Sequence, residues 1–230
     1  MFKKIILIFF VFCLMALLSC EVDKNPIASN SYADTTDGHW WDEDTIHVRK
    51  PNIYIYPAQK MNLTLKVVFP QGGSITESIP FYNGMWNIAV EPSGLIDNQY
   101  TYLYYECKIA DRFNYESGWK VEGNQLEQFF RNNLTLTGFI ETEIQDFIDY
   151  WIPRLELSDD YLIYPQYVED IAPLIELQFS NDPESLLRLL YIIETKQIND
   201  EIELPEPVIP EFTRKGFTVT EWGVILKTKG

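Results

Sequence analysis

Short apolar stretches with a two-residue period, separated by turn residues, constrain the fold of this chain more than any other feature. Residues 63–69 and 86–90 alternate bulky apolar side chains with mostly polar ones, and turns rich in glycine, proline and serine follow at 71–74 and 91–94. Successive side chains of a strand point to opposite faces, so this period is typical of strands buried on one face. Short strands at regular spacing favour an antiparallel sandwich. Residues 49–110 are therefore predicted to form a β-sandwich-like half.

A helical period follows in the middle of the chain. Apolar residues recur there at spacings of three and four, and Pro153 ends the pattern. This spacing places them on one face of a helix. They are Ile140, Ile144, Phe147, Ile148 and Trp151. We also expect a shorter helix over Gln125–Asn132, so residues 123–152 are predicted to form a central helix or helix pair.

Apolar runs return after Pro153 and predict a β-rich segment over residues 160–227. The run 186–193 fits a helix or a strand by periodicity alone, and its neighbours favour a strand. Proline-rich residues 204–210 are expected to form a loop or an edge connection. The fold class that follows is α+β: an N-terminal antiparallel β-sandwich-like half, a central helix or helix pair, and C-terminal strands. We expect one globular domain over residues 49–230.

The N-terminus resembles a bacterial lipoprotein signal. Lys3 and Lys4 precede the 14 uncharged residues Ile5–Leu18, and Ser19 and Cys20 follow directly. A spanning helix needs about 20 apolar residues, whereas a secretory signal of this length is ordinary. An ordinary secretory peptide or a buried apolar helix are the alternatives. We predict a lipoprotein signal peptide over residues 1–19 and lipidation of Cys20.

Residues 20–48 are rich in Asn, Ser, Asp and Thr and lack an apolar period, so they are predicted to be a flexible, lipid-anchored tether. Stable anchoring needs two or more acyl chains such as palmitate, which a processed lipoprotein carries. The expected location is therefore the bacterial cell envelope, with the membrane as a partner through the lipid. Glu21 and Asp23 lead to the further hypothesis of display on the outer membrane surface.

The chain is strongly acidic. Its formal charge is −16, and loss of Lys3 and Lys4 with the signal would change it to −18. Such a charge repels phosphate backbones, so no nucleic-acid partner is expected. Cys13 would leave with the signal and Cys20 would be acylated, so no intramolecular disulfide is expected. Cys107 lies in a tyrosine-rich run and is interpreted as a buried apolar residue rather than a nucleophile.

Four carboxylates are the candidate catalytic residues: Glu106, Glu141, Glu143 and Glu221. Two carboxylates at a suitable separation can cleave a glycosidic bond, which leads to the hypothesis of a carboxylate-dependent hydrolase acting on glycans. The alternative is that Glu106 and Glu221 pair with Arg112, Arg154, Arg188 or Arg214 in the core, and that Glu141 and Glu143 complement a helix N-terminus.

Aromatic residues, with 14 Tyr and 6 Trp, favour a different function, which is a non-enzymatic protein that binds a protein or glycan ligand. Core packing explains most of the rings equally well. The candidate binding residues are Tyr54, Tyr56, Tyr104, Trp86 and Trp222. Of the two functions, we expect binding rather than hydrolysis.

Metal and cofactor sites are not expected. His39, Asp42, Asp44 and His47 are of the right types, but their spacing matches no established metal motif. The sequence has no glycine-rich phosphate loop and no Gly-x-Ser-x-Gly elbow. Nucleotide enzymes and serine hydrolases are therefore disfavoured.

Three segments of the chain resemble an uncharacterised family of bacterial and fungal proteins. Residues 50–57 read Lys-Pro-Asn-Ile-Tyr-Ile-Tyr-Pro, residues 138–153 begin Gly-Phe-Ile-Glu-Thr-Glu and end Tyr-Trp-Ile-Pro, and residues 214–223 end Gly-Phe-Thr-Val-Thr-Glu-Trp-Gly. The resemblance implies no activity. The family pattern has Asn in place of Ile140, and an Asn would cap the helix. Ile cannot, so we expect the helix to start earlier, at Thr137.

Overall fold

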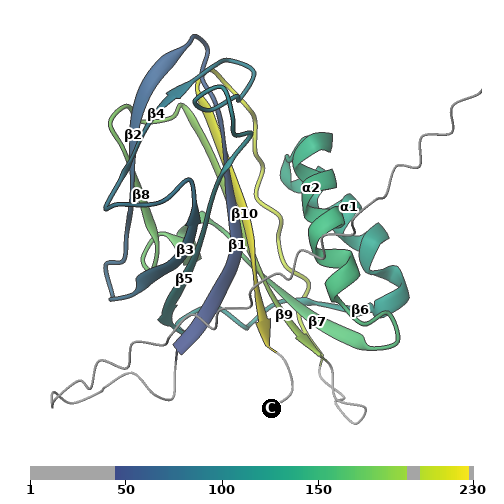
Figure 1. The fold of residues 1–230 in the computed structure, drawn as a ribbon. Helices are drawn as coiled ribbons and strands as arrows, with labels where there is room; N and C mark the ends of the chain where they lie inside the picture. The colour runs from purple at the N-terminus through teal and green to yellow at the C-terminus, as the bar shows by residue number, and fades with distance from the viewer. Residues whose placement is uncertain (1–44, 196–202, 228–230) are drawn as a thin grey trace, which may run out of the picture. The chain divides into compact units, whose positions relative to one another are not determined.

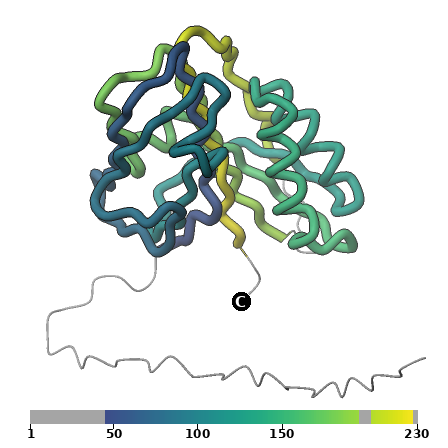
Figure 2. The backbone as a smooth tube through the Cα atoms, turned by 45° about the horizontal axis from the view of Figure 1, so that its top comes forward, coloured from purple at the N-terminus to yellow at the C-terminus, as the bar shows by residue number. Residues whose placement is uncertain are grey.

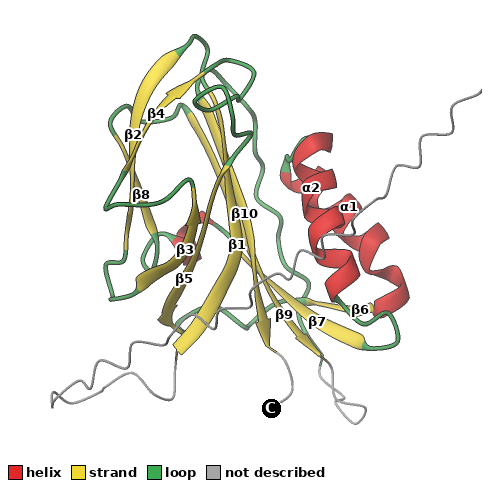
Figure 3. Ribbon diagram, viewed as in Figure 1, coloured by secondary structure: helices red, strands yellow, loops and turns green. Residues whose placement is uncertain are grey.

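The computed structural model describes residues 45–195 and 203–227 and has a mixed α+β fold (Figures 1 and 3). Strands come first, two helices follow, and strands return, as predicted. The strands are β1 (Thr45–Tyr56), β2 (Met61–Val68), β3 (Ser74–Ile79), β4 (Trp86–Val90), β5 (Leu103–Ala110), β6 (Trp119–Glu122), β7 (Asp160–Gln166), β8 (Glu176–Phe179), β9 (Ser185–Thr195) and β10 (Thr218–Lys227). The helices are α1 (Leu126–Thr137), α2 (Glu141–Trp151) and the short α3 (Val168–Ile171), with single turns η1 (Gly123–Gln125) and η2 (Ile152–Arg154).

The strands form two sheets. The larger has the order β3-β5-β1-β10-β9-β7-β6, and the smaller has the order β4-β2-β8. Only β9 and β10 are parallel among the paired strands that the structure describes. The smaller sheet covers one face of the larger, and α1 and α2 cover the other (Figures 1 and 2). The sandwich is not confined to residues 49–110 as predicted, because its second sheet is completed by β8, whose residues pair with β2.

Two cores lie on the two faces of the larger sheet. Ile53 and Ile55 of β1 pack between the sheets, whereas Tyr54 between them packs under the helices. Alternate residues of a strand face opposite sides, so a central strand covered on both faces must be bulky throughout. This explains the continuously bulky run in β1. It also explains β9, where the predicted strand is confirmed and where both faces are buried along most of its length.

The sheet begins earlier than the predicted domain boundary at residue 49. Residues Thr45–Val48 pair with β5, and Val48 is fully buried. These four residues therefore belong to the sheet and not to the predicted tether, whose residues 20–44 lie outside the described part. The register of β1 shifts between Val48 and Asn52, where Lys50 has a φ of 54°. The shift is a β-bulge, a device that changes the direction of side chains.

The two helices are separated by a tight turn. The first helix extends to Thr137, past the predicted end at Asn132, and α2 begins at Glu141 rather than at Thr137. Gly138, with a φ of 111°, ends α1, and its N–H donates to the carbonyls of Leu134 and Thr135. Ile140 has no side-chain cap to offer, but its N–H donates to Glu143 Oε2 at 2.9 Å, which stabilises the start of α2.

The apolar face predicted for the central helix is confirmed at four of its five positions. Ile144, Phe147, Ile148 and Trp151 of α2 are buried against the larger sheet, whereas Ile140, which precedes the helix, is 40% exposed. No helix within residues 45–195 and 203–227 is long and apolar enough to cross a membrane.

Gly138→Ala should destabilise the protein by more than the cost of its left-handed backbone, which is about 1–2 kcal/mol. A Cβ there would lie 2.7 Å from the ring of Phe212, so the ring must move as well. Gly84→Ala is the matched control, because Gly84 also has a positive φ but a Cβ added there would have no atom within 4 Å. Urea denaturation measures both; equal losses would contradict the contact with Phe212.

Candidate functional site

The interface between α2 and the larger sheet is polar as well as aromatic. The outward faces of β1 and β10 place Asn52, Tyr54, Thr220 and Trp222 beneath α2. We call this row of contacts the α2 seam. Residues from all three of the sequence segments quoted above meet there.

The carboxylate of Glu143 is the most connected group of the α2 seam. The residue is fully buried, and its carboxylate pairs with the Arg214 guanidinium. Thr220 Oγ1 donates to Glu143 Oε1 at 2.7 Å. Trp222 Nε1 donates to the backbone carbonyl of Glu143 at 3.0 Å. A buried carboxylate is tolerated only when it is paired and hydrogen-bonded, and here it ties α2 to β10 and to the segment before β10.

Tyr54 makes the second connection across the α2 seam. Its hydroxyl donates to Asp146 Oδ2 at 2.9 Å, and its ring packs against Trp222. Asn52 Nδ2 donates to the Tyr54 hydroxyl at 3.4 Å. Burial raises the pKa of Tyr54, and the neighbouring Asp146 carboxylate adds to this, so the phenol stays protonated and remains a donor.

Lys50 lies where the α2 seam opens to solvent. The bulge in β1 directs its ammonium over three tyrosine rings, with distances from Nζ to the centroids of 4.9 Å for Tyr102, 4.3 Å for Tyr104 and 5.2 Å for Tyr150. Burial lowers the pKa of Lys50, while Asp146 and Glu106 act in the opposite direction. Ring faces attract a cation, so the aromatic cluster holds the ammonium in place.

A cavity of about 430 Å³ lies beside Lys50, between the end of α2 and the strands. We call it the basic pocket. Its described lining is His47, Arg49, Glu106, Tyr150, Trp151, Arg154 and Leu226. They come from β1, β5, α2, η2 and β10. Three of the lining side chains are basic types, and Glu106 alone among the described lining residues carries a carboxylate.

The arginines of the basic pocket have no acidic partner among the described residues. Arg49 is exposed and makes no ion pair with any of them. The Arg154 guanidinium stacks on the Tyr150 ring at 3.8 Å and donates from Nη1 to the Tyr150 carbonyl at 2.5 Å. That contact completes the C-terminal end of α2 and positions the guanidinium, which leaves further N–H groups for another acceptor.

His47 contributes a polar but uncharged wall to the basic pocket. Burial lowers the pKa of His47, and the nearby charges of Lys108 and Arg49 lower it further, against a smaller opposite effect of Glu106. The ring is therefore neutral at pH 7, and its Nε2 has no hydrogen-bond partner among the described residues. Nε2 has almost no exposed surface, so the ring lines the basic pocket without adding charge.

Glu221 lies on the other face of the sheet. It is fully buried between the two sheets, where Arg188 Nε donates to its Oε2 at 2.6 Å and the Tyr105 hydroxyl donates to its Oε1 at 2.8 Å. Glu106 faces the helix side in the basic pocket. The two carboxylates cannot flank one glycosidic bond, because the sheet lies between them. Glu221 therefore matches the alternative given in the sequence analysis, in which it pairs with an arginine in the core.

The other two candidate carboxylates are also apart. Glu141 is largely exposed at the start of α2, with a long 3.6 Å ion pair to Arg131, whereas Glu143 is the buried centre of the α2 seam. The structure therefore places the four predicted carboxylates in four different surroundings. Of the four, Glu106 is the one that lines the basic pocket, among the residues that the structure describes.

Four of the five predicted aromatic binding residues pack in or against the cores, and the fifth, Tyr104, is buried beside Lys50. Tyr54, Tyr104, Trp86 and Trp222 are each at most 6% exposed, and Tyr56 is half-buried. Trp86 packs in the sandwich against Tyr82, and Trp222 packs under α2 against Phe147. These five residues do not form an exposed ligand surface. The alternative of core packing accounts for four of them, while Tyr104 also forms the ring face closest to Lys50.

Cys107 is free and fully buried between the sheets, and burial raises the pKa of its thiol. This agrees with its interpretation as a buried apolar residue. Cys20, His39, Asp42 and Asp44 lie outside the described residues. Of the four metal-ligand types near residue 40, only His47 is described, and it belongs to β1.

Sequence reasoning did not identify Arg49 or Arg154 as a binding residue, and it considered Arg154 only as a partner of Glu106 or Glu221 in the core. Arg49 and Lys50 precede the predicted first strand, and Arg154 follows the proline that ends the helical pattern. Each of these places was therefore interpreted as a loop between elements. The one available signal was their proximity to two of the quoted segments. Their meeting depends on a contact between residues about 100 positions apart, which periodicity does not reveal.

Comparisons with protein-family models, with curated proteins and with solved structures found no match. The resemblance described above therefore stays a prediction.

Arg188→Met should lower the free energy of unfolding by about 3–5 kcal/mol, because it leaves the Glu221 carboxylate buried and unpaired. The double variant Arg188→Met/Glu221→Leu should recover most of that loss, since neither charge then remains. Urea denaturation of the two variants and the parent protein measures this. A double variant no more stable than the single one would contradict a pairing between the two residues.

Proposed function

We propose that this protein is a lipid-anchored binding protein of the bacterial cell envelope, and that its basic pocket captures the carboxylate of a ligand. The observation that carries the proposal is the position of Arg49 and Arg154 at one cavity without an acidic partner among the described residues. The chain has 34 acidic and 18 basic residues. Because acidic residues outnumber basic ones, most basic side chains can find an acidic partner. Two arginines that lie at one cavity without such a partner among the described residues therefore suggest a binding site for an anion.

The geometry of the basic pocket suits a carboxylate. Arginine presents a planar set of N–H donors that matches the two oxygens of a carboxylate. The Arg154 guanidinium is already held by the Tyr150 ring and carbonyl, so little conformational freedom is lost when a ligand binds. Glu106 supplies an acceptor for a ligand N–H or O–H, and neutral His47 adds no charge to the lining.

Binding is favoured over hydrolysis. Two-carboxylate hydrolysis needs an acid and a second carboxylate on opposite sides of one bond. Of the two acids proposed for that role, Glu106 lines the basic pocket and Glu221 is paired with Arg188 behind the sheet. A pocket with one carboxylate and two arginines is better suited to hold an anion than to cleave a sugar.

Arg49→Gln and Arg154→Gln should each weaken carboxylate binding about tenfold or more, the loss expected for a hydrogen bond to a charged group. Calorimetric titration of the full-length protein with acidic oligosaccharides and free-acid peptides, each beside its methyl ester or amide, measures this. At least one acid should bind in preference to its neutral counterpart.

The control for this titration is Arg112→Gln, which removes an exposed arginine outside the basic pocket that is bonded to Gln71. It should bind like the parent protein. Equal binding of acids and neutral counterparts, or equal effects of all three substitutions, would remove the proposed function.

Anchoring rests on Cys20, and its removal should release the protein from membranes. In a bacterial host, Cys20→Ala should move the protein from the membrane fraction to the soluble fraction and abolish incorporation of labelled palmitate, because no acyl chain can attach. Cys107→Ala is the matched control and should keep the label. Label retained by Cys20→Ala would overturn the anchoring proposal.

A further inference from the structure

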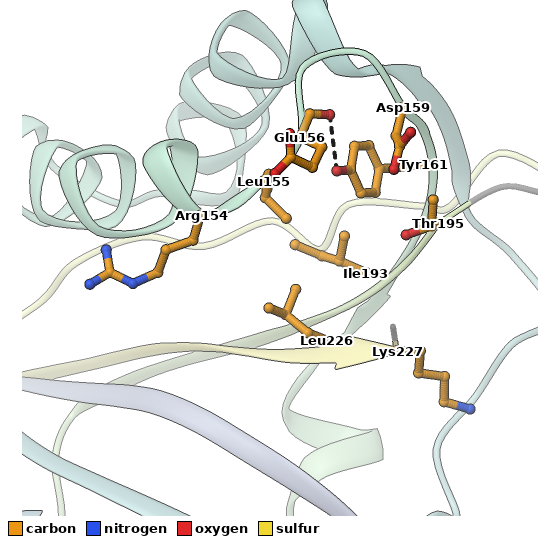
Figure 4. Close-up of a pocket in the computed structure, with 9 residues that line it drawn as sticks. All are labelled: Arg154, Leu155, Glu156, Asp159, Tyr161, Ile193, Thr195, Leu226 and Lys227. Carbon is orange, nitrogen blue, oxygen red and sulfur yellow. Dashed lines mark hydrogen bonds between the residues drawn. The ribbon is translucent and has the colours of Figure 1, made fainter. Parts of the chain in front are cut away.

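A second, apolar hollow is drawn in Figure 4 and shares two lining residues with the basic pocket. It has a volume of about 230 Å³ and lies beneath the turn that follows α2. Leu155, Ile193 and Leu226 form its floor, and the Tyr161 ring closes one side. The Tyr161 hydroxyl donates to the Glu156 carbonyl at 3.1 Å, so the ring presents its carbon face. We call this space the apolar hollow.

The two spaces share a wall. Arg154 and Leu226 line both of them. In Figure 4 the Arg154 side chain extends away from the apolar hollow, consistent with its stacking on Tyr150 at the basic pocket. A ligand group bound by the Arg154 guanidinium would therefore have an apolar space next to it.

Besides Arg154, the charged side chains in the lining of the apolar hollow are Glu156, Asp159 and Lys227. Neither Glu156 nor Asp159 makes an ion pair with a described residue. Lys227 lines the hollow, but its ammonium pairs with Asp111 at 2.8 Å and lies over the Tyr115 ring. This leaves Arg154 as the cation placed to hold a carboxylate beside the apolar hollow among its described lining residues. The ligand expected from this arrangement carries a carboxylate directly beside a small apolar group.

The size and lining of the apolar hollow narrow the ligand class. A long acyl chain needs an extended apolar tunnel, whereas this space is small and open at its rim. A sugar ring usually stacks on an exposed aromatic face, whereas the floor here consists of branched aliphatic side chains and the Tyr161 residue at its side is only 4% exposed. The last residue of a peptide has the required chemistry, because its free carboxylate is attached to the carbon that bears its side chain.

We infer that the basic pocket and the apolar hollow together bind the C-terminus of a peptide or protein chain, with the terminal carboxylate at Arg154 and an apolar last side chain in the hollow. The inference rests on the proposed function and names its ligand class.

The experiment varies the ligand, so its outcome does not depend on the folding of a variant. The full-length protein is titrated calorimetrically with the acetylated pentapeptide Gly-Ser-Gly-Ser-Leu as free acid, with its C-terminal amide, and with the free acid that ends in Gly instead of Leu. The free acid ending in Leu should bind about tenfold more tightly than either of the other two peptides. Arg154→Gln should remove the preference for acid over amide.

Each contrary outcome overturns a different statement. Equal binding of acid and amide would overturn recognition of the terminal carboxylate. Equal binding of the Leu and Gly peptides would overturn the role of the apolar hollow. If acidic oligosaccharides bind through Arg49 and Arg154 while no peptide binds, the inference fails and the proposed function stands; if no acid of either kind binds, both fail.

Discussion

The carboxylate of Glu143 is buried completely, so its charge must be balanced by the parts of the chain around it. Arg214, Thr220 and the N–H of Ile140 do this, and they come from the segment before β10, from β10 itself and from the turn before α2. Removing Arg214 would leave the buried carboxylate without its ion-pair partner. This requirement fixes the position of α2 on the sheet, and the position of α2 in turn determines where Tyr150 and Arg154 meet β1. The basic pocket is therefore a consequence of a buried ion pair that does not itself touch the pocket.

The larger sheet separates two chemical environments. Between the sheets, Glu221, Arg188 and Tyr105 form a buried ionic cluster in which both carboxylate oxygens of Glu221 have a donor, while Arg188 Nη2 has no partner among the described residues. On the helix side, the α2 seam is followed by Lys50 and then by the basic pocket. Arg49 and Arg154 line this pocket and have no acidic partner among the described residues. A buried cluster contributes to folding, whereas open donors beside a cavity can bind a ligand. Glu143 and Glu221 are therefore structural because they are buried and paired, whereas Glu106, which is the same residue type, lines the basic pocket.

Much of the fold could be predicted from periodicity, and most of the site could not. The alternation in β2 and β4 and the helical spacing in α2 are local signals, so the α+β class and the order of elements were accessible. The α2 boundary was wrong because Gly138 allows a tight turn that ends α1 where the second helix was expected to start. The pairing of β2 with β8 joins residues more than 100 positions apart, and no local pattern specifies it. The role of each glutamate depended on which face of the sheet it occupied and on its neighbours there.

The sequence by itself determined that strands precede and follow a central helical part, that the chain is strongly acidic and that Cys107 lies in a tyrosine-rich apolar run, because composition and period are properties of short stretches. The tertiary structure decided which acidic and aromatic residues are buried, that Glu106 and Glu221 lie on opposite faces of one sheet, and that Arg49 and Arg154 meet at a cavity. The physical reason is that burial and electrostatic pairing depend on distance in space. Folding alone brings together charges that are far apart along the chain.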